Sequence, residues 1–459
     1  MGGYESASMR AVLRAARGLH LFRGVLEDDT GRSFLALLET LAADGAEAEP
    51  GDILEAYARF FSLLAKEAES AGPAVIGDAW QRHLLDRLLF DENPFSHHAQ
   101  MVGAAAMSPA LLEAAALDLR ILQRFFRLEG TVVAEMLSIR LGGAQDSFVP
   151  WSGLLSPSAS HDGREDPSAA LRVRFAETSD WAVLLPDLAS HYAAKGAGLF
   201  ARYRAFRWVR RNGHSYLEGI LHSDPVRLDD LVEYEAERAL LLQNTEQFVR
   251  GFRANNVLLY GERGTGKSST IKALLNRYGD QGLRMVEVPK GLLEEFPRIL
   301  GILRGRRERF VLFVDDLSFD ERETSYKELK AVLEGGLEAR PDNVVVYATS
   351  NRRHLVQERF SDRAGGDGEI RGWDSHQEKL SLADRFGVTL VFSAPDQERY
   401  LRIVGSLARQ RGLDVGTDHL RARSLEWAAQ QGGFSGRTAR QFVDHLAGEL
   451  GIKALRPAE

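Results

Sequence analysis

The sequence predicts an α/β fold in which helices flank a parallel sheet, with a mostly α-helical region before the sheet and a small α-helical region after it. In the second half of the chain, apolar runs that end at Tyr260, Val314, Ala348 and Phe392 alternate with helical stretches. Uninterrupted apolar runs are typical of parallel strands that are buried on both faces. A glycine-rich loop follows the first of these runs. The alternation, the uninterrupted apolar runs and this loop together favour the α/β fold class.

The strands of the sheet are predicted from five short segments. They are Val257–Tyr260, Arg284–Val288, Phe310–Val314, Val344–Ala348 and Val388–Phe392. Amphipathic helical patterns connect several of them, and others follow the last strand from Pro395 onward. Strands that alternate with helices in this way indicate a parallel sheet.

The chain before the sheet is predicted to be helical. Apolar residues recur three and four apart, for example at Leu54, Tyr57 and Phe61. Ser156–Ser168 is rich in Ser, Pro, Gly and charge, which is typical of a linker. A second helical piece is expected from Trp181 to Asn212.

Composition narrows the class of protein. The 459 residues are 44% hydrophobic and 27% charged, as in ordinary globular domains, and the formal net charge of −7 gives no overall attraction to nucleic acid. The absence of cysteine excludes disulfides, thiol catalysis and cysteine metal sites. We find no apolar run of membrane-spanning length and no signal-peptide core, so we expect a cytoplasmic protein without a membrane partner.

The loop from Gly261 to Ser268 fits the phosphate-binding pattern G-x-x-x-x-G-K-[ST] between a strand and a helix. Glycines allow the backbone to approach a phosphate closely, and the loop N–H groups and helix N-terminus face the anion. Lys267 can reach the outer phosphates, and the Ser268 hydroxyl can ligate Mg²⁺. The predicted nucleotide-binding residues of this loop are Gly261, Arg263, Gly264, Thr265, Gly266, Lys267, Ser268 and Ser269.

Polar residues at the ends of two later strands complete the predicted site. Asp315 and Asp316 follow the run that ends at Val314, and Asn351 follows the run that ends at Ala348. The carboxyl ends of parallel strands form the edge where ligands bind. There Asp315 can hold Mg²⁺ through water and Asp316 can orient or deprotonate an attacking water, while Asn351 can place that water. The alternative for these residues is an ordinary solvated turn.

Sequence spacing alone does not assign a role to Arg385, to Arg437 or to the arginines of the run Phe200–Arg211. Arg385 and Arg437 are surface cations or partners of an acid such as Asp384 or Glu378. The basic and aromatic run Phe200–Arg211 either binds nucleic acid through phosphates and stacked bases, or is a helix with buried aromatics and solvated arginines.

The order of these motifs resembles that of an AAA+ ATPase. The segments that carry the resemblance are Gly261–Ser268, Asp315–Asp316, Thr349–Asn351, Asp384–Phe386 and Gly433–Arg437. The resemblance implies four domains: an N-terminal α-helical domain (1–155), a linker and helical segment (156–212), an AAA+ nucleotide-binding α/β domain (213–394) and an α-helical lid (395–459).

Four longer strings resemble more closely the bacterial ATP-binding family labelled domain of unknown function 815. They are Asn255–Leu259, Asp315–Phe319, Tyr347–Leu355 and Glu378–Gly387. This resemblance spans Phe206 to Leu413, and the general AAA+ pattern continues to Leu450.

The AAA+ resemblance implies roles around one nucleotide. Lys267 and Ser268 would bind phosphates and Mg²⁺. Asp315 would be the metal-side carboxylate, and Asn351 would be the residue called sensor 1. Asp316 stands where most members carry Glu, and an Asp-Asp pair is usual in the initiators and helicase loaders of the superfamily, which act as nucleotide switches.

It also implies roles at the edges of the site. Arg385 would be an arginine finger that reaches the nucleotide of a neighbouring subunit, and Arg437 would be sensor 2 on the lid. Leu231 and Val232 would help to enclose the adenine.

The first hypothesis for function is therefore a Mg-ATP-binding ATPase that assembles into a homo-oligomer and remodels or loads an unidentified protein partner. The alternative is an ATP-dependent DNA-binding switch with slow hydrolysis, supported by Arg202–Arg211 and by Asp316. A kinase with the same phosphate loop explains neither Asn351 nor the lid.

Overall fold

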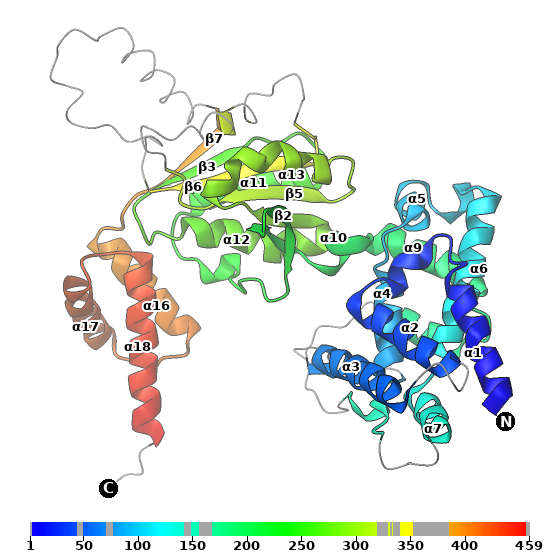
Figure 1. The fold of residues 1–459 in the computed structure, drawn as a ribbon. Coiled ribbons are helices and arrows are strands. Elements are labelled where there is room, and N and C mark those ends of the chain that lie inside the picture. Colours follow the sequence, from blue (N-terminus) through cyan, green and yellow to red (C-terminus); the bar gives the residue numbers. More distant parts are fainter. Residues whose placement is uncertain are drawn as a thin grey trace, which may run out of the picture. The chain divides into compact units, whose positions relative to one another are not determined.

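The computed structural model describes residues 2–43, 49–69, 77–141, 148–155, 168–318, 329–330, 333, 340–351 and 385–455. The chain divides into two compact units, Met1–Arg202 and Tyr203–Glu459 (Figure 1). Residues 156–167 of the expected linker lie outside the described residues. The four-part division expected from the sequence remains a prediction.

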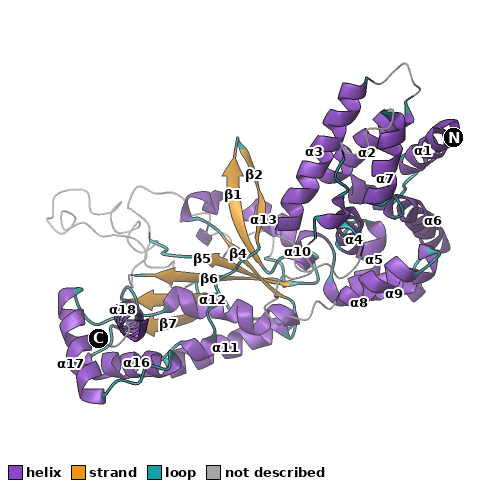
Figure 2. Cartoon of the chain, turned by 90° about the horizontal axis from the view of Figure 1, so that it is seen from below, coloured by secondary structure: helices purple, strands orange, loops and turns teal. Residues whose placement is uncertain are grey.

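The first unit is helical over its described part, as the sequence predicts (Figure 2). Side-chain caps define where several helices begin: Asp28 accepts from Gly31 N at 2.8 Å, and Asp78 and Gln81 form a reciprocal capping box. The helices are α1 (Gly2–Ala16), α2 (Asp29–Ala42), α3 (Pro50–Glu69), α4 (Ala79–Leu89), α5 (Pro94–Val102), α6 (Pro109–Phe126), α7 (Gly130–Arg140), α8 (Ala169–Glu177), α9 (Leu185–Lys195) and α10 (Gly198–Arg202).

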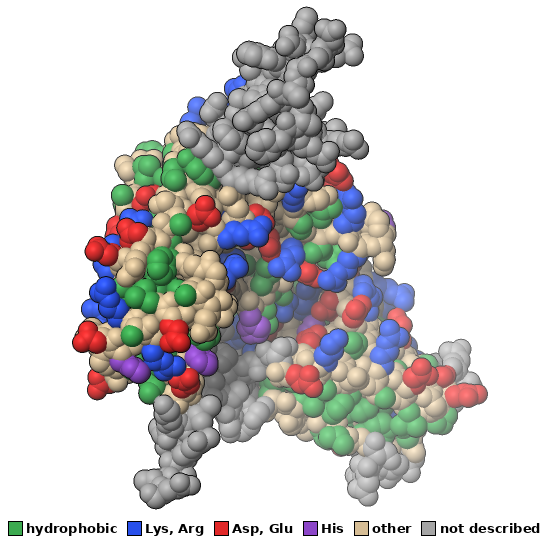
Figure 3. Space-filling model, turned by 90° about the vertical axis from the view of Figure 1, so that its left-hand side faces the viewer, with side chains coloured by type: hydrophobic (Ala, Val, Ile, Leu, Met, Phe, Trp, Pro, Cys, Tyr) green, Lys and Arg blue, Asp and Glu red, His purple; other side chains and the backbone are tan. Residues whose placement is uncertain are grey.

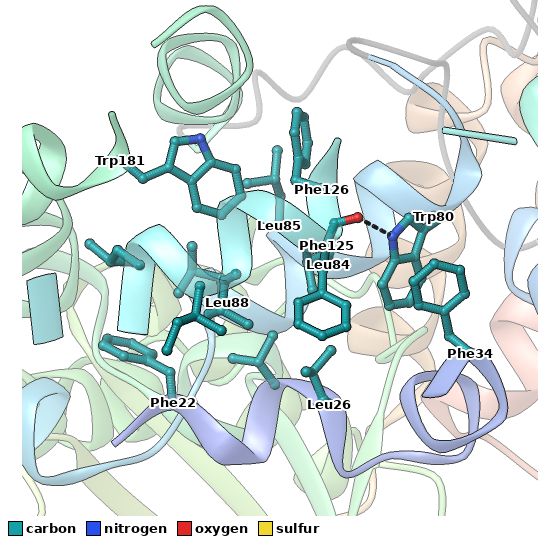
Figure 4. Close-up of a cluster of buried hydrophobic side chains, with 14 of the residues drawn as sticks. Phe22, Leu26, Phe34, Trp80, Leu84, Leu85, Leu88, Phe125, Phe126 and Trp181 are labelled. Carbon is teal, nitrogen blue, oxygen red and sulfur yellow. Dashed lines mark hydrogen bonds between the residues drawn. The ribbon is translucent and has the colours of Figure 1, made fainter. Parts of the chain in front are cut away.

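Large aromatic side chains fill the core of this unit. Phe34, Phe60 and Trp151 are fully buried, and the ring of Trp80 lies 3.9 Å from that of Phe34, centroid to centroid. The Trp80 indole donates to Phe125 O at 2.9 Å, so its polar atom is satisfied inside the apolar cluster (Figure 4). This core explains why the unit is compact without any part of the sheet.

A buried carboxylate in the same unit accepts hydrogen bonds from the backbone. Asp118 has no exposed surface and accepts hydrogen bonds from the backbone N–H groups of His20, Leu21 and Phe22 at 2.7–3.0 Å. These N–H groups begin the 3₁₀ turn Phe22–Leu26 (η1) and have no helical partner of their own. Asp118 therefore serves the fold.

The second unit is built on a mostly parallel sheet. Among the described residues, seven strands pair in the order β2-β1-β4-β5-β6-β3-β7, and only β1 and β2 run antiparallel to each other. The strands are β1 (Ala205–Arg211), β2 (His214–Ile220), β3 (Val257–Gly261), β4 (Leu283–Glu287), β5 (Arg309–Val314), β6 (Val344–Ser350) and β7 (Val388–Phe392). The five strands expected from the sequence are confirmed, and the α/β fold class with them.

Helices cover the sheet so that its central strands are buried on both faces. Every residue of β6 is buried, which explains its uninterrupted apolar run. Leu241 of α11 (Glu235–Val249) and Leu274 of α12 (Lys267–Tyr278) join one core with alternate residues of β3, β5 and β6. The remaining helix between β4 and β5 is α13 (Phe296–Leu303), with Pro297 in its first turn.

The helical expectation for residues 205–211 is wrong, because this segment is strand β1. The physical reason is visible in its alternation: Phe206 and Trp208 are buried while Arg207 is exposed, which is the period of a strand. β1 pairs with β4 on one side and with β2 on the other. The hairpin thus extends the sheet beyond the strands expected from the sequence.

Three helices after β7 form the C-terminal part of this unit, as expected. They are α16 (Gln397–Gln410), α17 (Thr417–Gln430) and α18 (Gly436–Leu455). Tyr400, Ile403 and Phe442 contribute to their common core. Val232, from the segment before α11, packs against this core and ties the helices to the sheet domain.

On the face shown in Figure 3, basic and acidic side chains lie interspersed.

None of the described helices combines the length and the apolar character needed to cross a lipid bilayer.

Candidate functional site

The loop between β3 and α12 owes its shape to glycine. Gly261, Gly264 and Gly266 all have positive φ angles, of 144°, 77° and 93°. A Cβ on Gly261 would lie 1.9 Å from Phe392 O, in the neighbouring strand β7. The hydroxyl of Thr265 donates to Glu262 O at 2.9 Å and closes the turn. The backbone therefore forms a tight cradle immediately before the N-terminus of α12.

Lys267 begins α12 and turns back over this loop. Its ammonium donates to Gly261 O at 2.8 Å, to Glu262 O at 2.7 Å and to Asn351 Oδ1 at 3.2 Å. Burial lowers the pKa of Lys267, although the nearby Asp315 and Asp316 act in the opposite direction. The three donors of the ammonium are thus held by neutral oxygens that a phosphate can replace.

Asp315 and Asp316 follow β5 at the same edge of the sheet. Asp315 Oδ1 accepts from Ser268 Oγ at 2.6 Å and from Thr349 Oγ1 at 2.5 Å. Asp316 has a φ of 53° and accepts from Asn351 Nδ2 at 2.5 Å. The structure therefore brings the polar ends of β3, β5 and β6 into one hydrogen-bonded group.

The helical part of the unit touches the loop directly. α18 begins at Gly436, and Arg437 N donates to Gly264 O at 3.1 Å. A Cβ on Gly264 would lie 3.0 Å from Ser435 Oγ and 3.1 Å from Arg437 Cβ. A larger residue at position 264 would push α18 away from the loop.

These groups line one cavity of about 590 Å³. The predicted residues that line it are Leu231, Val232, Arg263, Gly264, Thr265, Gly266, Lys267, Ser268, Ser269, Asp315, Asp316, Asn351 and Arg437. Gly261 is outside the lining but is bonded to Lys267 through its carbonyl. A phosphate loop, carboxylates and cations around a cavity of this size suit a phosphorylated ligand together with a divalent cation.

Four apolar residues, which we call the apolar slot, also line the cavity. Leu231 and Val232 face it from the segment before α11, and Ile403 and Leu407 face it from α16. Tyr234 also lines the cavity, and its ring lies 4.8 Å from that of Phe392, centroid to centroid, in a tilted arrangement. The Arg399 guanidinium lies over the Tyr234 ring, 5.2 Å from its centroid. Glu233 links the two walls, because it pairs with Arg399 at 3.1 Å and with Arg402 at 2.7 Å.

Sequence reasoning missed seven residues that line the cavity. They are Asp230, Tyr234, Thr349, Ile403, Leu407, Gly436 and Arg440. Arg440 carried a usable signal, since it is three residues after Arg437 and therefore on the same face of α18. Thr349 carried another, because it precedes Asn351 by two positions and so shares its side of β6.

Arg385 lies away from this cavity. It is exposed and precedes β7, whereas the phosphate loop follows β3. Because β3 and β7 are parallel neighbours, the two positions are at opposite edges of the sheet. Glu378 and Asp384, its alternative partners, lie outside the described residues.

The arginines of β1 face acids from neighbouring segments. Arg207 pairs with Glu287 at 2.8 Å, Arg210 with Glu294 at 3.0 Å, and Arg211 with Glu218 at 2.9 Å. Arg204 pairs with Asp280. The aromatic residues of the run, Phe206 and Trp208, are buried. The arginines and the aromatic side chains that suggested nucleic-acid binding therefore form contacts within the fold.

The first unit holds a second polar cluster, around His83. His83 Nδ1 lies 2.7 Å from Glu67 Oε2, and His83 Nε2 lies 3.3 Å from Asp28 Oδ2. Burial disfavours the charged imidazole, but the two carboxylates outweigh it and raise the pKa of His83 to about 9. Arg87 lies 3.6 Å from the same Asp28 oxygen. Two carboxylates and two basic side chains thus form one network of ion pairs.

The family of the chain follows from residues 201–450, which match "Protein of unknown function (DUF815)". The chain belongs to this family. The matched segment contains β1–β7, the cavity and most of α18. The architecture of this DUF815 protein is a mostly parallel sheet flanked by helices, with a helical region before it and helices after it, as its sequence predicts.

Solved structures similar to the DUF815 chain include a Holliday junction branch migration motor and an AAA domain. Thermotoga maritima RuvB is 18% identical, with 50% of this chain and 67% of RuvB covered and a TM-score of 0.34. The FIGL-1 AAA domain in complex with ADP is 21% identical, with 51% and 77% covered and a TM-score of 0.34. No curated protein matches the chain in sequence.

Proposed function

We propose that this DUF815 protein is a Mg-ATP-binding AAA+ ATPase that couples ATP binding and hydrolysis to the remodelling or loading of a partner. One observation carries the proposal: a single cavity joins the phosphate loop at Lys267, the strand-end acids, Asn351 and arginines of the C-terminal helices. A glycine-rich loop with only a structural role would not require this convergence of charged groups.

The phosphates are expected at the loop end of the cavity. The loop N–H groups and the N-terminus of α12 face this end, and Lys267 exchanges its carbonyl partners for phosphate oxygens. Arg263, Arg437 and Arg440 add three guanidinium groups to the same lining. The base is expected in the apolar slot between Leu231 and Leu407.

The residues present fit a magnesium ion. Ser268 Oγ and Asp315 Oδ1 are hard oxygen donors and lie 2.6 Å apart beside the phosphate end of the cavity. Mg²⁺ is commonly held by one or two carboxylates together with substrate phosphates. When bound, the ion would neutralise charge that develops on the phosphate oxygens.

Hydrolysis is assigned to the acid that follows Asp315. Asp316 would orient the attacking water and accept its proton, and Asn351 would hold that water near the terminal phosphate. The Asn351 amide accepts a hydrogen bond from Lys267 and donates one to Asp316. A phosphate that replaced Asn351 as the partner of Lys267 would therefore change the position of the amide that contacts Asp316.

Arg385 is proposed to act on a second copy of the chain. Because it lies at the sheet edge opposite the phosphate loop, it would complete the site of a neighbouring subunit in a homo-oligomer. A switch that binds DNA in its ATP state, with slow hydrolysis, is the weaker candidate, since the β1 arginines are neutralised by acids.

The direct test is equilibrium binding of a fluorescent ATP analogue with Mg²⁺. Lys267→Ala should abolish binding, because the ammonium contacts the outer phosphates. Lys272→Ala is the matched control: it removes a lysine from the same helix that faces Asp224 at 3.5 Å, outside the cavity. Equal binding by wild type and Lys267→Ala would reject the assignment of the loop.

A further inference from the structure

Thr349 touches both strand-end acids. It lies in β6, next to β5, and the register pairs Val314 with Ala348, so Asp315 and Thr349 come next at this edge. The side chain of Thr349 is only 2% exposed. Water therefore cannot easily satisfy its hydroxyl, and its hydrogen-bond partners are those that the fold supplies.

The Thr349 hydroxyl contacts the side chain of Asp315 and the backbone N–H of Asp316. Thr349 Oγ1 donates to Asp315 Oδ1 at 2.5 Å and accepts from Asp316 N at 2.9 Å. Asp315 Oδ1 also accepts from Ser268 Oγ at 2.6 Å. One carboxylate oxygen is thus fixed between hydroxyls from β6 and α12, and this determines how the carboxylate faces the cavity.

The bond to Asp316 holds an unfavourable backbone conformation. Asp316 has a φ of 53°, a left-handed conformation that is unfavourable for a residue other than glycine. From this conformation its carboxylate accepts from Asn351 Nδ2 at 2.5 Å. Without the Thr349 hydroxyl, Asp316 N would lose this partner, and the geometry at Asn351 would lose its support.

We infer that Thr349 is a positioning residue whose hydroxyl orients Asp315 toward the divalent cation of a bound Mg-nucleotide and holds Asp316 against Asn351. The inference rests on the proposed function. A threonine that only packs would tolerate valine, which has nearly the same shape but neither donates nor accepts a hydrogen bond. The comparison of valine with serine therefore separates positioning from packing.

The experiment measures the affinity for a fluorescent ADP analogue in Mg²⁺ and in EDTA. Thr349→Val should reduce the gain in affinity that Mg²⁺ provides by about 10- to 100-fold, the usual effect of losing a residue that orients a metal ligand. Its affinity in EDTA should stay at the wild-type value. Thr349→Ser should keep the gain, and Thr349→Ala should lose it as the valine variant does.

Thr245→Val is the matched control. The Thr245 hydroxyl is fully buried, donates to Leu241 O at 2.8 Å and lies 2.9 Å from the Tyr347 hydroxyl, and Thr245 is not part of the cavity lining. This variant should lose stability but keep the full effect of Mg²⁺. Folding of each variant is checked by circular dichroism, and Thr349→Ala carries the test if the valine variant does not fold.

Two results would overturn the inference. A wild-type Mg²⁺ gain in Thr349→Val and Thr349→Ala would show that the hydroxyl does not position Asp315. An equal loss of affinity in Mg²⁺ and EDTA would show a structural role. If wild-type protein and Lys267→Ala both bind no nucleotide, the proposed function fails and this inference fails with it.

Discussion

The arginines of β1 and the arginines around the cavity have opposite surroundings. Arg207 and Arg210 each meet a carboxylate of a neighbouring segment. Arg263, Arg437 and Arg440 line the cavity, and their guanidinium groups form no ion pair with any residue in the described part of the chain. The more conspicuous basic run in the sequence is thus the one whose charge is already neutralised.

This difference shows what a cluster of basic residues does and does not indicate. Glu218, the partner of Arg211, is close in sequence, but Glu287 and Glu295 lie about 80 positions after the arginines that they neutralise. These two pairings cannot be seen in the local sequence. Unneutralised guanidinium groups around a cavity are the stronger indication of an anionic ligand, because such charges gain most from a multivalent partner.

The largest expected effect concerns Arg385, a cation that neither group includes. Arg385→Ala should lower ATP turnover by about 10³- to 10⁵-fold, the range for an arginine finger, and leave ATP affinity unchanged. Steady-state turnover and equilibrium binding on the same preparation measure the two quantities. Unchanged turnover at every protein concentration would reject the assignment.

The second prediction concerns His83, a basic residue of the first unit that, like the β1 arginines, is paired with carboxylates. The pKa of His83 is about 9 in the folded protein and 6.5 ordinarily, so its ion pairs with Asp28 and Glu67 stabilise fully below pH 6.5. That stability, up to about 3 kcal/mol, is lost as pH rises through 9. Thermal unfolding of wild type and His83→Gln at pH 6 and pH 9.5 measures it.

The difference between wild type and His83→Gln removes the contribution of other titrating groups. It should be large at pH 6 and small at pH 9.5. An equal difference at both values would mean that folding does not raise the pKa of His83.

The third prediction tests the comparison of arginines directly. Arg437→Ala and Arg440→Ala should each weaken ATP binding by about 10- to 100-fold, because a charge-assisted hydrogen bond contributes about 1.5–3 kcal/mol. Arg210→Ala, which removes a paired arginine, should leave ATP affinity unchanged. Isothermal titration on the three variants gives the values, and a loss in Arg210→Ala equal to that in Arg440→Ala would remove the basis for the comparison.

The smallest expected effect is on DNA. Because the β1 arginines are paired, retention on DNA should be weak with or without ATP and should not change in a variant that replaces Arg204, Arg207, Arg210 and Arg211 by Ala. Filter binding across a salt series measures it. A steep salt dependence that this variant abolishes would instead establish the DNA-binding switch.

Sequence reasoning reached the parts of the fold in which local pattern and burial agree. The apolar runs of β5 and β6 are buried on both faces, so composition alone reveals them. β1 was missed because the arginines between its buried aromatics gave it the appearance of a basic helix. Its alternation of buried and exposed residues was nevertheless present in the sequence.

The candidate site divides in the same way. The loop and strand-end residues follow from sequence position, since parallel strands end at one edge. The apolar slot depends on how α16 packs against the segment before α11, which no local pattern specifies. Ile403 and Leu407 therefore looked like ordinary residues of an amphipathic helix, although they line the cavity.

The most direct measurement is ATP turnover per protomer as a function of protein concentration, with Lys267→Ala as the blank. We expect turnover that rises steeply with concentration, because Arg385 of one copy would complete the site of another. Turnover that stays at the level of the blank at all concentrations, while ATP still binds tightly, would contradict an ATPase assembled between subunits.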